Sequence, residues 1–325
     1  MILVTGGTGF VGRHLVRALA GRGREVRCLV RDAARARAIL PAGVLLHEGD
    51  LVDRARLEQA LDGVDRVIHL AGVIKASAPQ QFYQVNAAGT QQLCAAIAAV
   101  RPRLARLIHV SSLAAAGPSP ADLPRDEGVP SRPISHYGKS KLAGERFVAE
   151  LGERVPVTIV RPCAVYGPED PELLKFFQLV QRGVRPAIGF GARWVSLVHV
   201  ADLVRALDEL LERERAAHQT FFVAEPEPYT WSFLLDLVSR TLGRFALPIV
   251  VPETLVRATG FASEMLARLL GKTTMLNRDK ARELCARAWT CRTTRIETEL
   301  GFHCALRVAE GLPQTIAWYQ EHGWL

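Results

Sequence analysis

Residues 2–12 read Ile-Leu-Val-Thr-Gly-Gly-Thr-Gly-Phe-Val-Gly, and this stretch decides the fold. An apolar run leads directly into glycines at positions 6, 9 and 12, and an amphipathic segment follows. Gly6 permits a tight turn, Gly9 lets a phosphate approach the backbone, and Gly12 lets the next helix pack against the strand. A strand before these glycines and a helix after them predict a site for a dinucleotide pyrophosphate, held at the helix N-terminus.

The rest of the N-terminal half alternates strand-like apolar runs with helix-like segments. This alternation indicates βαβ units, and therefore an α/β fold in which helices cover both faces of a doubly wound parallel sheet (a Rossmann fold). We expect strands at residues 2–5, 25–30, 44–47, 66–70, 104–110 and 157–160, and helices at 11–20, 54–61, 82–100 and 137–151.

After Pro162 the pattern becomes less regular. We predict a dinucleotide-binding domain over residues 1–165 and a smaller, mostly helical substrate lobe over 166–325. Residues 195–215 are expected to return to the first domain as a strand and a helix. In the lobe we expect helices at 172–182, 201–213, 231–242, 253–270 and 308–321.

Composition limits the alternatives. The 325 residues are 49% hydrophobic, carry a formal net charge of +8 and include six cysteines. The Arg residues are dispersed, which favours a solvated basic surface with no specific nucleic-acid partner, although a nucleic-acid binder stays an alternative on charge alone. No C-x-x-C pair occurs, so we expect reduced thiols, no metal and a cytoplasmic protein. We expect neither a signal peptide nor a transmembrane segment.

The end of the second strand bears on the choice of cofactor. NAD sites usually place an acidic residue there, whereas this chain has Val30 followed by Arg31, whose guanidinium suits the 2′-phosphate of NADP. Asp32 follows and leaves a ribose contact open as the alternative. We therefore favour NADP(H) over NAD(H). The other backbone and side-chain contacts to the cofactor that we expect here come from Phe10, Val11, Asp50, Leu51, Leu70 and Ala71.

Residues 137–141 read Tyr-Gly-Lys-Ser-Lys at the start of an expected helix. Positions i and i+4 lie on one helical face, so Tyr137 and Lys141 project together. A neighbouring ammonium lowers the pKa of a phenol, which lets Tyr137 exchange a proton with a carbonyl or alcohol oxygen. Lys141 should also reach the nicotinamide ribose, and Ser112, at the end of the fifth strand, could serve as a second hydrogen-bond donor to the substrate oxygen.

Taken together, these features resemble the extended short-chain dehydrogenase/reductase family, part of the NAD-dependent epimerase/dehydratase superfamily. The matching motifs lie in family order at residues 5–12, 49–51, 69–72, 85–90, 110–112, 137–141 and 161–168. The resemblance implies an enzyme with Ser112, Tyr137 and Lys141 as its catalytic residues, with Ser111 as the competing serine. It also implies that Asn86 orders the local backbone and that Pro162 and Val165 border the nicotinamide.

The substrate is inferred from absent residues. The nucleotide-sugar branch of the family commonly has Asn where this chain has Ala164, and Arg where it has Val195, although a register slip could bring in Arg193. The losses remove donors that a diphosphate needs. Residues 161–162 and 310–319 resemble the 3β-hydroxysteroid dehydrogenase-like branch, akin to dihydroflavonol-type reductases. This looser resemblance implies a bulky, largely apolar (steroid- or flavonoid-like) secondary alcohol or ketone as small-molecule substrate.

Three further functions stay open: a nucleotide-sugar 4-epimerase, a dehydratase of the same family, and an NADP-binding protein without turnover. The apolar residues of 247–252 and 253–270 are expected to form lobe core, with a pocket wall or a peripheral membrane contact as the alternatives. The resemblance also implies a homodimer formed through the helices at 82–100 and 137–151.

Overall fold

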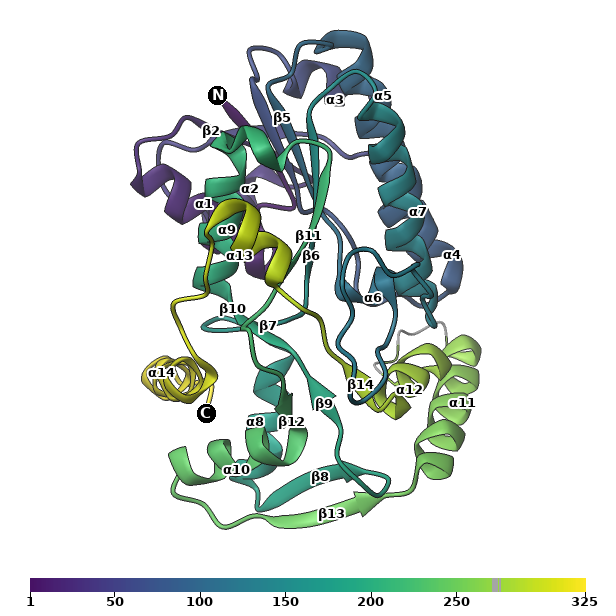
Figure 1. Cartoon of the computed structure of the whole chain (residues 1–325). Coiled ribbons are helices and arrows are strands. Elements are labelled where there is room, and N and C mark those ends of the chain that lie inside the picture. The colour runs from purple at the N-terminus through teal and green to yellow at the C-terminus, as the bar shows by residue number, and fades with distance from the viewer. Residues whose placement is uncertain (271–273, 275) are drawn as a thin grey trace.

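The computed structural model describes residues 1–270, 274 and 276–325 (Figure 1). A seven-stranded, entirely parallel sheet forms the upper part of the molecule, in the order β11-β6-β5-β4-β1-β2-β3. Its strands are β1 (Ile2–Thr5), β2 (Val26–Val30), β3 (Leu45–Glu48), β4 (Arg66–His69), β5 (Arg106–Val110), β6 (Val157–Pro162) and β11 (Gln219–Val223).

Helices cover both faces of this sheet, because a parallel sheet must bury both of its faces. On one face, α1 (Phe10–Gly21) and α9 (Val200–Glu212) bury Leu15, Leu19 and Leu207 in one apolar layer. On the other face, the second layer includes Leu57 and Leu93, from α3 (Arg54–Ala60) and α5 (Thr90–Val100). The helix α7 (His136–Leu151) lies beside α5 and adds to this layer (Figure 1). The doubly wound parallel sheet predicted from the sequence is confirmed.

Two local features differ from the expected elements. The segment expected as one helix over 82–100 consists of α4 (Pro79–Phe82), a π-helix η1 (Tyr83–Gly89) and α5. The strand within 195–215 is β10 (Leu197–His199), which pairs with β7 (Ala164–Tyr166) outside the main sheet. The strand that joins the main sheet from this part of the chain is β11, which follows α9 and the 3-10 turn Glu214–Ala216 and which the sequence analysis did not identify.

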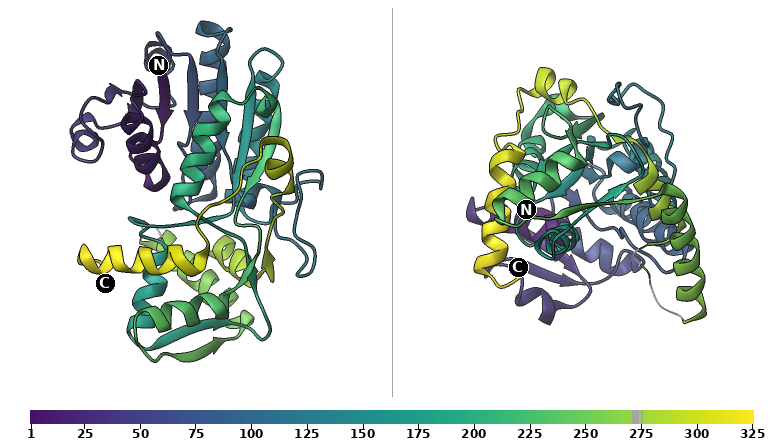
Figure 2. Two further views of the ribbon diagram at one scale, coloured as in Figure 1. Left: turned by 60° about the vertical axis from the view of Figure 1, so that its left-hand side comes forward. Right: turned by 90° about the horizontal axis from the view of Figure 1, so that it is seen from below.

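The second lobe lies below the carboxyl ends of the strands (Figures 1 and 2). Its strands form small sheets: β8 (Val184–Ile188) with β13 (Leu247–Val251), and β9 (Trp194–Val195) with β12 (Tyr229–Thr230) and β14 (Ala288–Trp289). Its helices are α8 (Leu173–Gln181), α10 (Trp231–Thr241), α11 (Glu253–Leu269), α12 (Arg278–Cys285) and α14 (Val308–Glu321). A third apolar cluster, which includes Leu234, Leu312 and Tyr319, joins α8, α10 and α14. The short helices α2 (Ala33–Arg37), α6 (Leu113–Ala116) and α13 (Thr294–Leu300) complete the chain.

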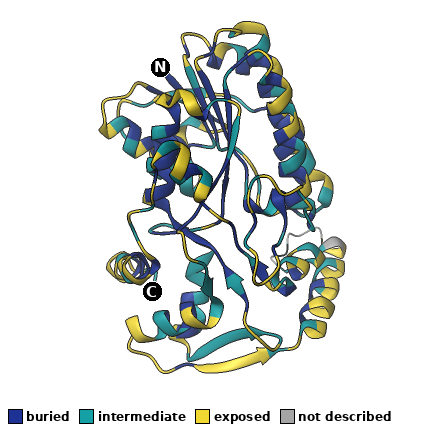
Figure 3. Cartoon of the chain, viewed as in Figure 1, coloured by how far each residue is buried: buried dark blue, intermediate teal, exposed yellow. Residues whose placement is uncertain are grey.

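The expectation that residues 247–270 form lobe core was wrong. The strand β13 is mostly exposed, and along α11 the side chains of Leu255, Leu266 and Leu269 are exposed (Figure 3). Among the large apolar residues of α11, Val256 is buried, facing α12. The physical reason is that α11 packs chiefly against the short helix α12, which covers one side of it. No helix in the described part of the chain is long and apolar enough to cross a bilayer.

Candidate active site

The turn between β1 and α1 is built around two glycines. Gly6 has a φ of +73°, and a Cβ there would lie 2.6 Å from the amide nitrogen of Ala71. A Cβ at Gly12 would lie 2.1 Å from the carbonyl oxygen of Gly6. Gly9 is the N-cap of α1, and the first turn, which contains Phe10 and Val11, has no acidic residue. The turn therefore leaves a cradle of backbone N–H groups at a helix N-terminus, which suits an anion such as a pyrophosphate.

The residues expected at the adenosine end lie as follows. Arg31 is exposed at the carboxyl end of β2. The side chain of Asp32 accepts a hydrogen bond of 2.9 Å from the amide of Arg35 and thus caps α2. Asp50 is partly buried after β3, whereas the side chain of Leu51 is buried against the layer that contains α5. Because its carboxylate serves as a helix cap, Asp32 is less suited to a ribose contact than Arg31 is to a phosphate contact.

A chain of hydrogen bonds runs beneath the turn through the buried ring of His69. The amide of Ala71 donates to Oγ1 of Thr5 (3.3 Å), and Thr5 contacts Nδ1 of His69 (2.6 Å). Nε2 of His69 lies 2.9 Å from Oγ1 of Thr90, which donates to the carbonyl oxygen of Asn86 (2.8 Å). Burial lowers the pKa of His69 to about 3, helped by the nearby charge of Lys141, so the ring is neutral. The donors fit one tautomer, with the proton on Nε2.

Asn86 lies in the π-helix and joins three segments. Its side-chain amide accepts from the amide of Val73 (2.8 Å) and donates to the carbonyl oxygen of Val73 (3.0 Å) and to Oγ of Ser140 (3.0 Å). Leu70 and Ala71 lie three and two residues before the anchored Val73. Single π-turns often occur at functional sites. Here the wider turn places Asn86 between the loop after β4 and the helix α7.

Tyr137 and Ser112 meet at one cavity, and Lys141 lies behind them. Ser112 caps α6 by accepting from the amide of Ala114 (3.1 Å), and Ser112 and Tyr137 both line the same cavity. Nζ of Lys141 donates to the carbonyl oxygen of Val110 (2.7 Å). Ser111 points elsewhere, since its hydroxyl donates to the buried carboxylate of Glu145. The geometry thus separates the two serines, and Ser112 is the one beside Tyr137.

The pKa values of Tyr137 and Lys141 are set mainly by burial. Burial raises the pKa of Tyr137 to about 12, while its hydrogen bond with Ser112 opposes that rise and the charge of Glu283 adds to it. Burial lowers the pKa of Lys141 to about 8, and the carboxylate of Glu145 opposes that fall. The lowered phenol pKa that we expected from the Lys141 ammonium is therefore not found in this chain. Desolvation of the phenolate is the largest cause of the raised pKa, and the charge of Lys141 is not among its causes.

A buried ion pair supports this end of α7. Arg161 lies in β6, and its guanidinium donates to both carboxylate oxygens of Glu145 at 2.9 and 2.6 Å. Both side chains are almost completely buried. Sequence reasoning missed Glu145, although its position four residues after Lys141 on the same helical face was a usable signal.

The cavity beside Tyr137 has a volume of about 270 Å³ and a mostly apolar lining. Trp194, Trp231 and Trp289 contribute to it together with Phe176 and Ile188. Ala164, two residues after Pro162, and Val195 also line it, and neither side chain offers a polar donor. The charged residues at its wall are Arg193 and the pair formed by Lys280 and Glu283 (3.1 Å). Val165 lies partly buried in β7 behind this wall.

The guanidinium of Arg193 is hydrogen-bonded by groups of the protein itself. It donates to the carbonyl oxygens of Ile188 (2.5 Å), Cys285 (2.8 Å) and Ala286 (3.0 Å), and to Oε1 of Glu253 (2.6 Å). Most of its N–H groups are thereby used. Arg193 consequently does not replace the diphosphate-binding arginine that is absent at Val195.

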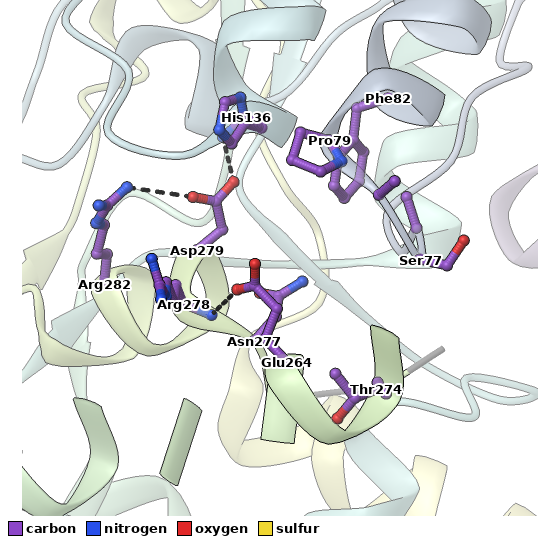
Figure 4. Close-up of a pocket in the computed structure, with 13 residues that line it drawn as sticks. Ser77, Pro79, Phe82, His136, Glu264, Thr274, Asn277, Arg278, Asp279 and Arg282 are labelled. Carbon is purple, nitrogen blue, oxygen red and sulfur yellow. Dashed lines mark hydrogen bonds and ion pairs between the residues drawn. The ribbon is translucent and has the colours of Figure 1, made fainter. Parts of the chain in front are cut away.

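A second, more polar cavity of about 170 Å³ lies where α12 meets the start of α7 (Figure 4). Asp279 accepts a hydrogen bond from the amide of His136 (2.5 Å) and an ion-pair contact from Arg282 (3.4 Å). Glu264 of α11 accepts from the amide of Arg278 (3.1 Å). The bond from His136 joins α12 to the residue that precedes Tyr137, and the bond to Glu264 joins α12 to α11.

Comparisons with known proteins agree with this geometry. The profile described as "NAD dependent epimerase/dehydratase family" matches residues 2–224. "Ceramide reductase" of Caulobacter vibrioides is 32% identical over all of this chain and 96% of its own length. A "4-hydroxy-2-methyl-3-oxo-4-farnesyl-3,4-dihydroquinoline-1-oxide ketoreductase" of Stigmatella aurantiaca is 31% identical over 86% of this chain and 89% of its own.

Solved structures show the same fold over the whole chain. The crystal structure of gox2253 superposes with a TM-score of 0.83 at 26% identity and covers 100% of this chain and 99% of the other. The UDP-glucose 4-epimerase of Thermus thermophilus, in complex with NAD, gives a TM-score of 0.80 at 22% identity and covers 98% of both chains. The second likeness concerns the fold alone.

Proposed function

Because the chain belongs to the NAD-dependent epimerase/dehydratase family, as an extended short-chain dehydrogenase/reductase that binds a nicotinamide cofactor, we propose that it is an NADP(H)-dependent oxidoreductase. Its reaction would move a hydride between the nicotinamide and a secondary alcohol or ketone on a bulky, largely apolar molecule. The observation that carries this proposal is the tryptophan-lined cavity of about 270 Å³, which has Tyr137 and Ser112 in its wall.

The chain fits such a cofactor at two places. The glycine turn leaves no room for side chains at Gly6 and Gly12 and presents free N–H groups at the start of α1. Lys141 lies close to the loop after β4, since a Cβ at Gly72 would be 3.7 Å from its Nζ. The bound nicotinamide supplies or accepts the hydride. Ser112 and Tyr137 hold the reacting oxygen, and Lys141 holds a positive charge beneath them.

The pKa of Tyr137 favours the role of proton donor. With a pKa near 12, the phenol keeps its proton at neutral pH and can give it to the ketone oxygen as that oxygen becomes an alcohol. In ketone reduction the carbon gains the hydride, the oxygen gains the phenol proton, and the phenolate left behind is stabilised by the Lys141 ammonium and the Ser112 hydroxyl.

The relatives support an apolar substrate. The two relatives described above, 32% and 31% identical, are named for the reduction of a ceramide and of a farnesylated quinoline, both lipid-like molecules. A nucleotide-sugar 4-epimerase is the second candidate. It is favoured by the fold shared with the UDP-glucose 4-epimerase and by a 24% identical undecaprenol-linked sugar 4-epimerase of Escherichia coli. Two observations argue against the epimerase: the N–H groups of Arg193 are mostly bonded to the protein, and position 164 is an alanine. A desolvated diphosphate needs hydrogen-bond donors that these positions do not offer.

Three finer assignments belong to the same proposal. NADP(H) is favoured over NAD(H), since Arg31 is exposed at the end of β2 while Asp32 caps a helix. A cytoplasmic location is supported by the six cysteines, which are all free thiols. A homodimer formed through α5 and α7 rests on the family resemblance.

A thermal-shift assay on the NADP⁺-loaded protein tests the substrate class. A ligand that binds only the folded state raises its melting temperature. One ligand group consists of long-chain keto-amides, 3β-hydroxysteroids and flavonoid-like ketones, and the other of UDP- and dTDP-sugars. We expect a shift with the first group alone, followed by nicotinamide turnover with the same compounds. A shift with the sugars alone would make the epimerase the leading function.

A further inference from the structure

The lower edge of the second lobe carries an uncovered apolar face. Phe190 at the tip of the β8–β9 loop is 86% exposed, and Phe245 before β13 is 83% exposed. Between them in the sequence or beside them in the lobe, Leu247, Ile249 and Val250 of β13 and Leu255 and Leu269 of α11 are also exposed. Much of β13 and α11 is coloured as exposed in Figure 3. We call the residues Phe190, Phe245, Leu247, Ile249, Val250 and Leu255 the apolar face. Large exposed apolar side chains that gather at one edge of a protein often mark a surface that binds a partner or a membrane.

The charges that flank the apolar face are mainly basic. Arg240 and Arg244 are exposed just before β13, and Arg257 is exposed in the first turns of α11. The acidic side chain in this stretch is Glu253, and it is paired with Arg193 and Arg257. The whole chain carries a formal net charge of +8. Aromatic side chains surrounded by arginines suit the boundary between headgroups and acyl chains of an anionic lipid surface.

A cavity leads from this edge toward the site of chemistry. It has a volume of about 260 Å³ and is lined by Pro248 of β13 and by Gly189, Gly191 and Ala192 of the loop that bears Phe190. Its polar lining residues include Ser232 and the ion pair of Arg185 with Asp236. Its inner wall is formed by Ile188, Arg193 and Trp231, and these three residues also line the cavity beside Tyr137. These three shared side chains therefore form a common wall between the two cavities.

We propose that the apolar face docks on an anionic lipid bilayer, and that an acyl-chain substrate passes from the bilayer through the cavity at Pro248 and Trp231 to Tyr137. The entry route rests on the proposed function, whereas docking itself rests on the face and its charges. An enzyme that acts on a bilayer-dissolved substrate gains by lying on the bilayer, because such a molecule has a very low concentration in water.

The test of docking is co-sedimentation of the full chain with large vesicles in the absence of any ketone. Vesicles of phosphatidylcholine alone are compared with vesicles in which about a third of the lipid is anionic phosphatidylglycerol. We expect binding that is stronger to the anionic vesicles. The double variant Phe190→Ser/Phe245→Ser should bind them at least about tenfold more weakly, since each fully buried phenylalanine is worth a factor of ten or more.

Matched controls separate docking from folding and from dimerisation. The double variant Leu45→Ser/Leu123→Ser removes two exposed leucines elsewhere on the surface and should bind vesicles like the unmodified chain. Absence of vesicle binding by the unmodified chain would overturn the proposal. So would light scattering that shows a dimer which the Phe190→Ser/Phe245→Ser variant converts to a monomer, because the apolar face would then be a subunit interface.

The entry route has its own readout. With a long-chain ketone supplied in anionic vesicles, the Phe190→Ser/Phe245→Ser variant should show a KM raised about tenfold or more, in proportion to its lost binding. Its kcat/KM for a short, water-soluble ketone should equal that of the unmodified chain. Equal losses with both ketones would overturn the entry route. Failure to reduce any ketone would instead contradict the proposed function and would leave the vesicle-binding result standing.

Discussion

The guanidinium of Arg161 binds both carboxylate oxygens of Glu145, one helical turn beyond Lys141. The pair holds β6 against α7, and its negative member opposes the fall in the pKa of Lys141. A buried pair of this kind is weak evidence for net stability, but the loss of one partner leaves an uncompensated charge.

We predict that Glu145→Gln lowers the free energy of unfolding by about 3–5 kcal/mol, the usual cost of breaking a buried ion pair. The measurement is urea unfolding followed by circular dichroism. The control is Glu58→Gln, which removes the partner of Arg54 in an exposed i,i+4 pair and should cost less than about 1 kcal/mol. Similar costs for the two variants would show that the Glu145 pair is not a buried, desolvated contact.

Replacement of Tyr137 by Phe should remove the proton donor and keep the ring. We expect kcat for ketone reduction to fall by about 10²–10⁴, the typical contribution of a general acid. Binding of NADPH, followed by its fluorescence, should persist. Tyr83→Phe is the matched control, because it removes a partly buried phenol that contacts His136 outside the apolar cavity. A Tyr137→Phe enzyme with unchanged kcat would exclude Tyr137 as the donor.

The pH profile of kcat/KM for reduction should reflect Lys141. Its pKa is lowered from about 10.5 to about 8, so the folded chain loses this charge as pH rises through about 8. Tyr137 is still protonated there, since its pKa is raised to about 12. Activity should therefore decline above pH 8, and Lys141→Arg, which keeps its charge, should remove the decline. A flat profile up to pH 10 in the unmodified enzyme would contradict the lowered pKa.

The same shift predicts how stability depends on pH. Between about pH 8 and 10.5 the unfolded chain binds more protons at Lys141 than the folded chain does, so this residue makes the free energy of unfolding rise with pH. Below pH 8 both states are protonated, and the contribution becomes constant. Urea unfolding of the unmodified chain and of Lys141→Met at pH 7.5 and 10 measures the difference. The free energy of unfolding of the unmodified chain minus that of Lys141→Met should rise from pH 7.5 to pH 10. A fall in this value would contradict the lowered pKa of Lys141.

Cofactor preference should depend on Arg31. We expect Arg31→Asp to shift the ratio of kcat/KM values from NADPH toward NADH by at least about tenfold, because it replaces a charge-assisted phosphate contact by a repulsion. Arg103→Asp changes the net charge equally at an exposed position in the turn before β5. It should leave the ratio unchanged. An equal ratio in all three proteins would remove Arg31 from the cofactor site.

Gly12 should tolerate no side chain. A Cβ at Gly12 would lie 2.1 Å from the carbonyl oxygen of Gly6, so Gly12→Ala should force α1 away from β1 and weaken both stability and NADPH binding. Gly21 in the last turn of the same helix has open space around its Cβ position. Gly21→Ala should therefore stabilise the chain by up to about 1 kcal/mol. Thermal unfolding with and without NADPH distinguishes the two variants.

The sheet was predictable because its signals are local. The glycine turn at residues 6–12 and the regular alternation of apolar and helix-like segments were enough to predict the first six strands and their parallel sheet. The strand β11 (Gln219–Val223) was not predicted, because it lies outside the regular alternation of the N-terminal half. Its place in the sheet depends on pairing with β6, which is distant in the sequence. The π-helix was also missed, because a single wider turn leaves the apolar period of residues 82–100 almost unchanged.

The relative positions of the proposed site residues were easier to predict than their environment. The spacing of Tyr137 and Lys141 predicts one shared face of α7, and in the structure Ser112 and Tyr137 line one cavity. Burial, however, was not predictable from spacing, and the pKa of Tyr137 moved opposite to our expectation. The exposure of α11 was also not predictable, because the sequence of an apolar helix does not show whether another element covers it.

Arg193 joins distant parts of the chain through a single side chain, from Ile188 nearby in the sequence to Ala286, which lies 93 positions beyond it. A change from the proposed lipid-like substrate to one with a diphosphate could not be reached by turning this arginine inward, because the loop after β8, α11 and the end of α12 would lose their common hydrogen-bond partner. A new cation at position 164 or 195 would be needed first. Arg193 thus both lines the cavity and holds the lobe together. Substitutions that alter specificity should therefore occur at positions around Arg193 and not at Arg193 itself.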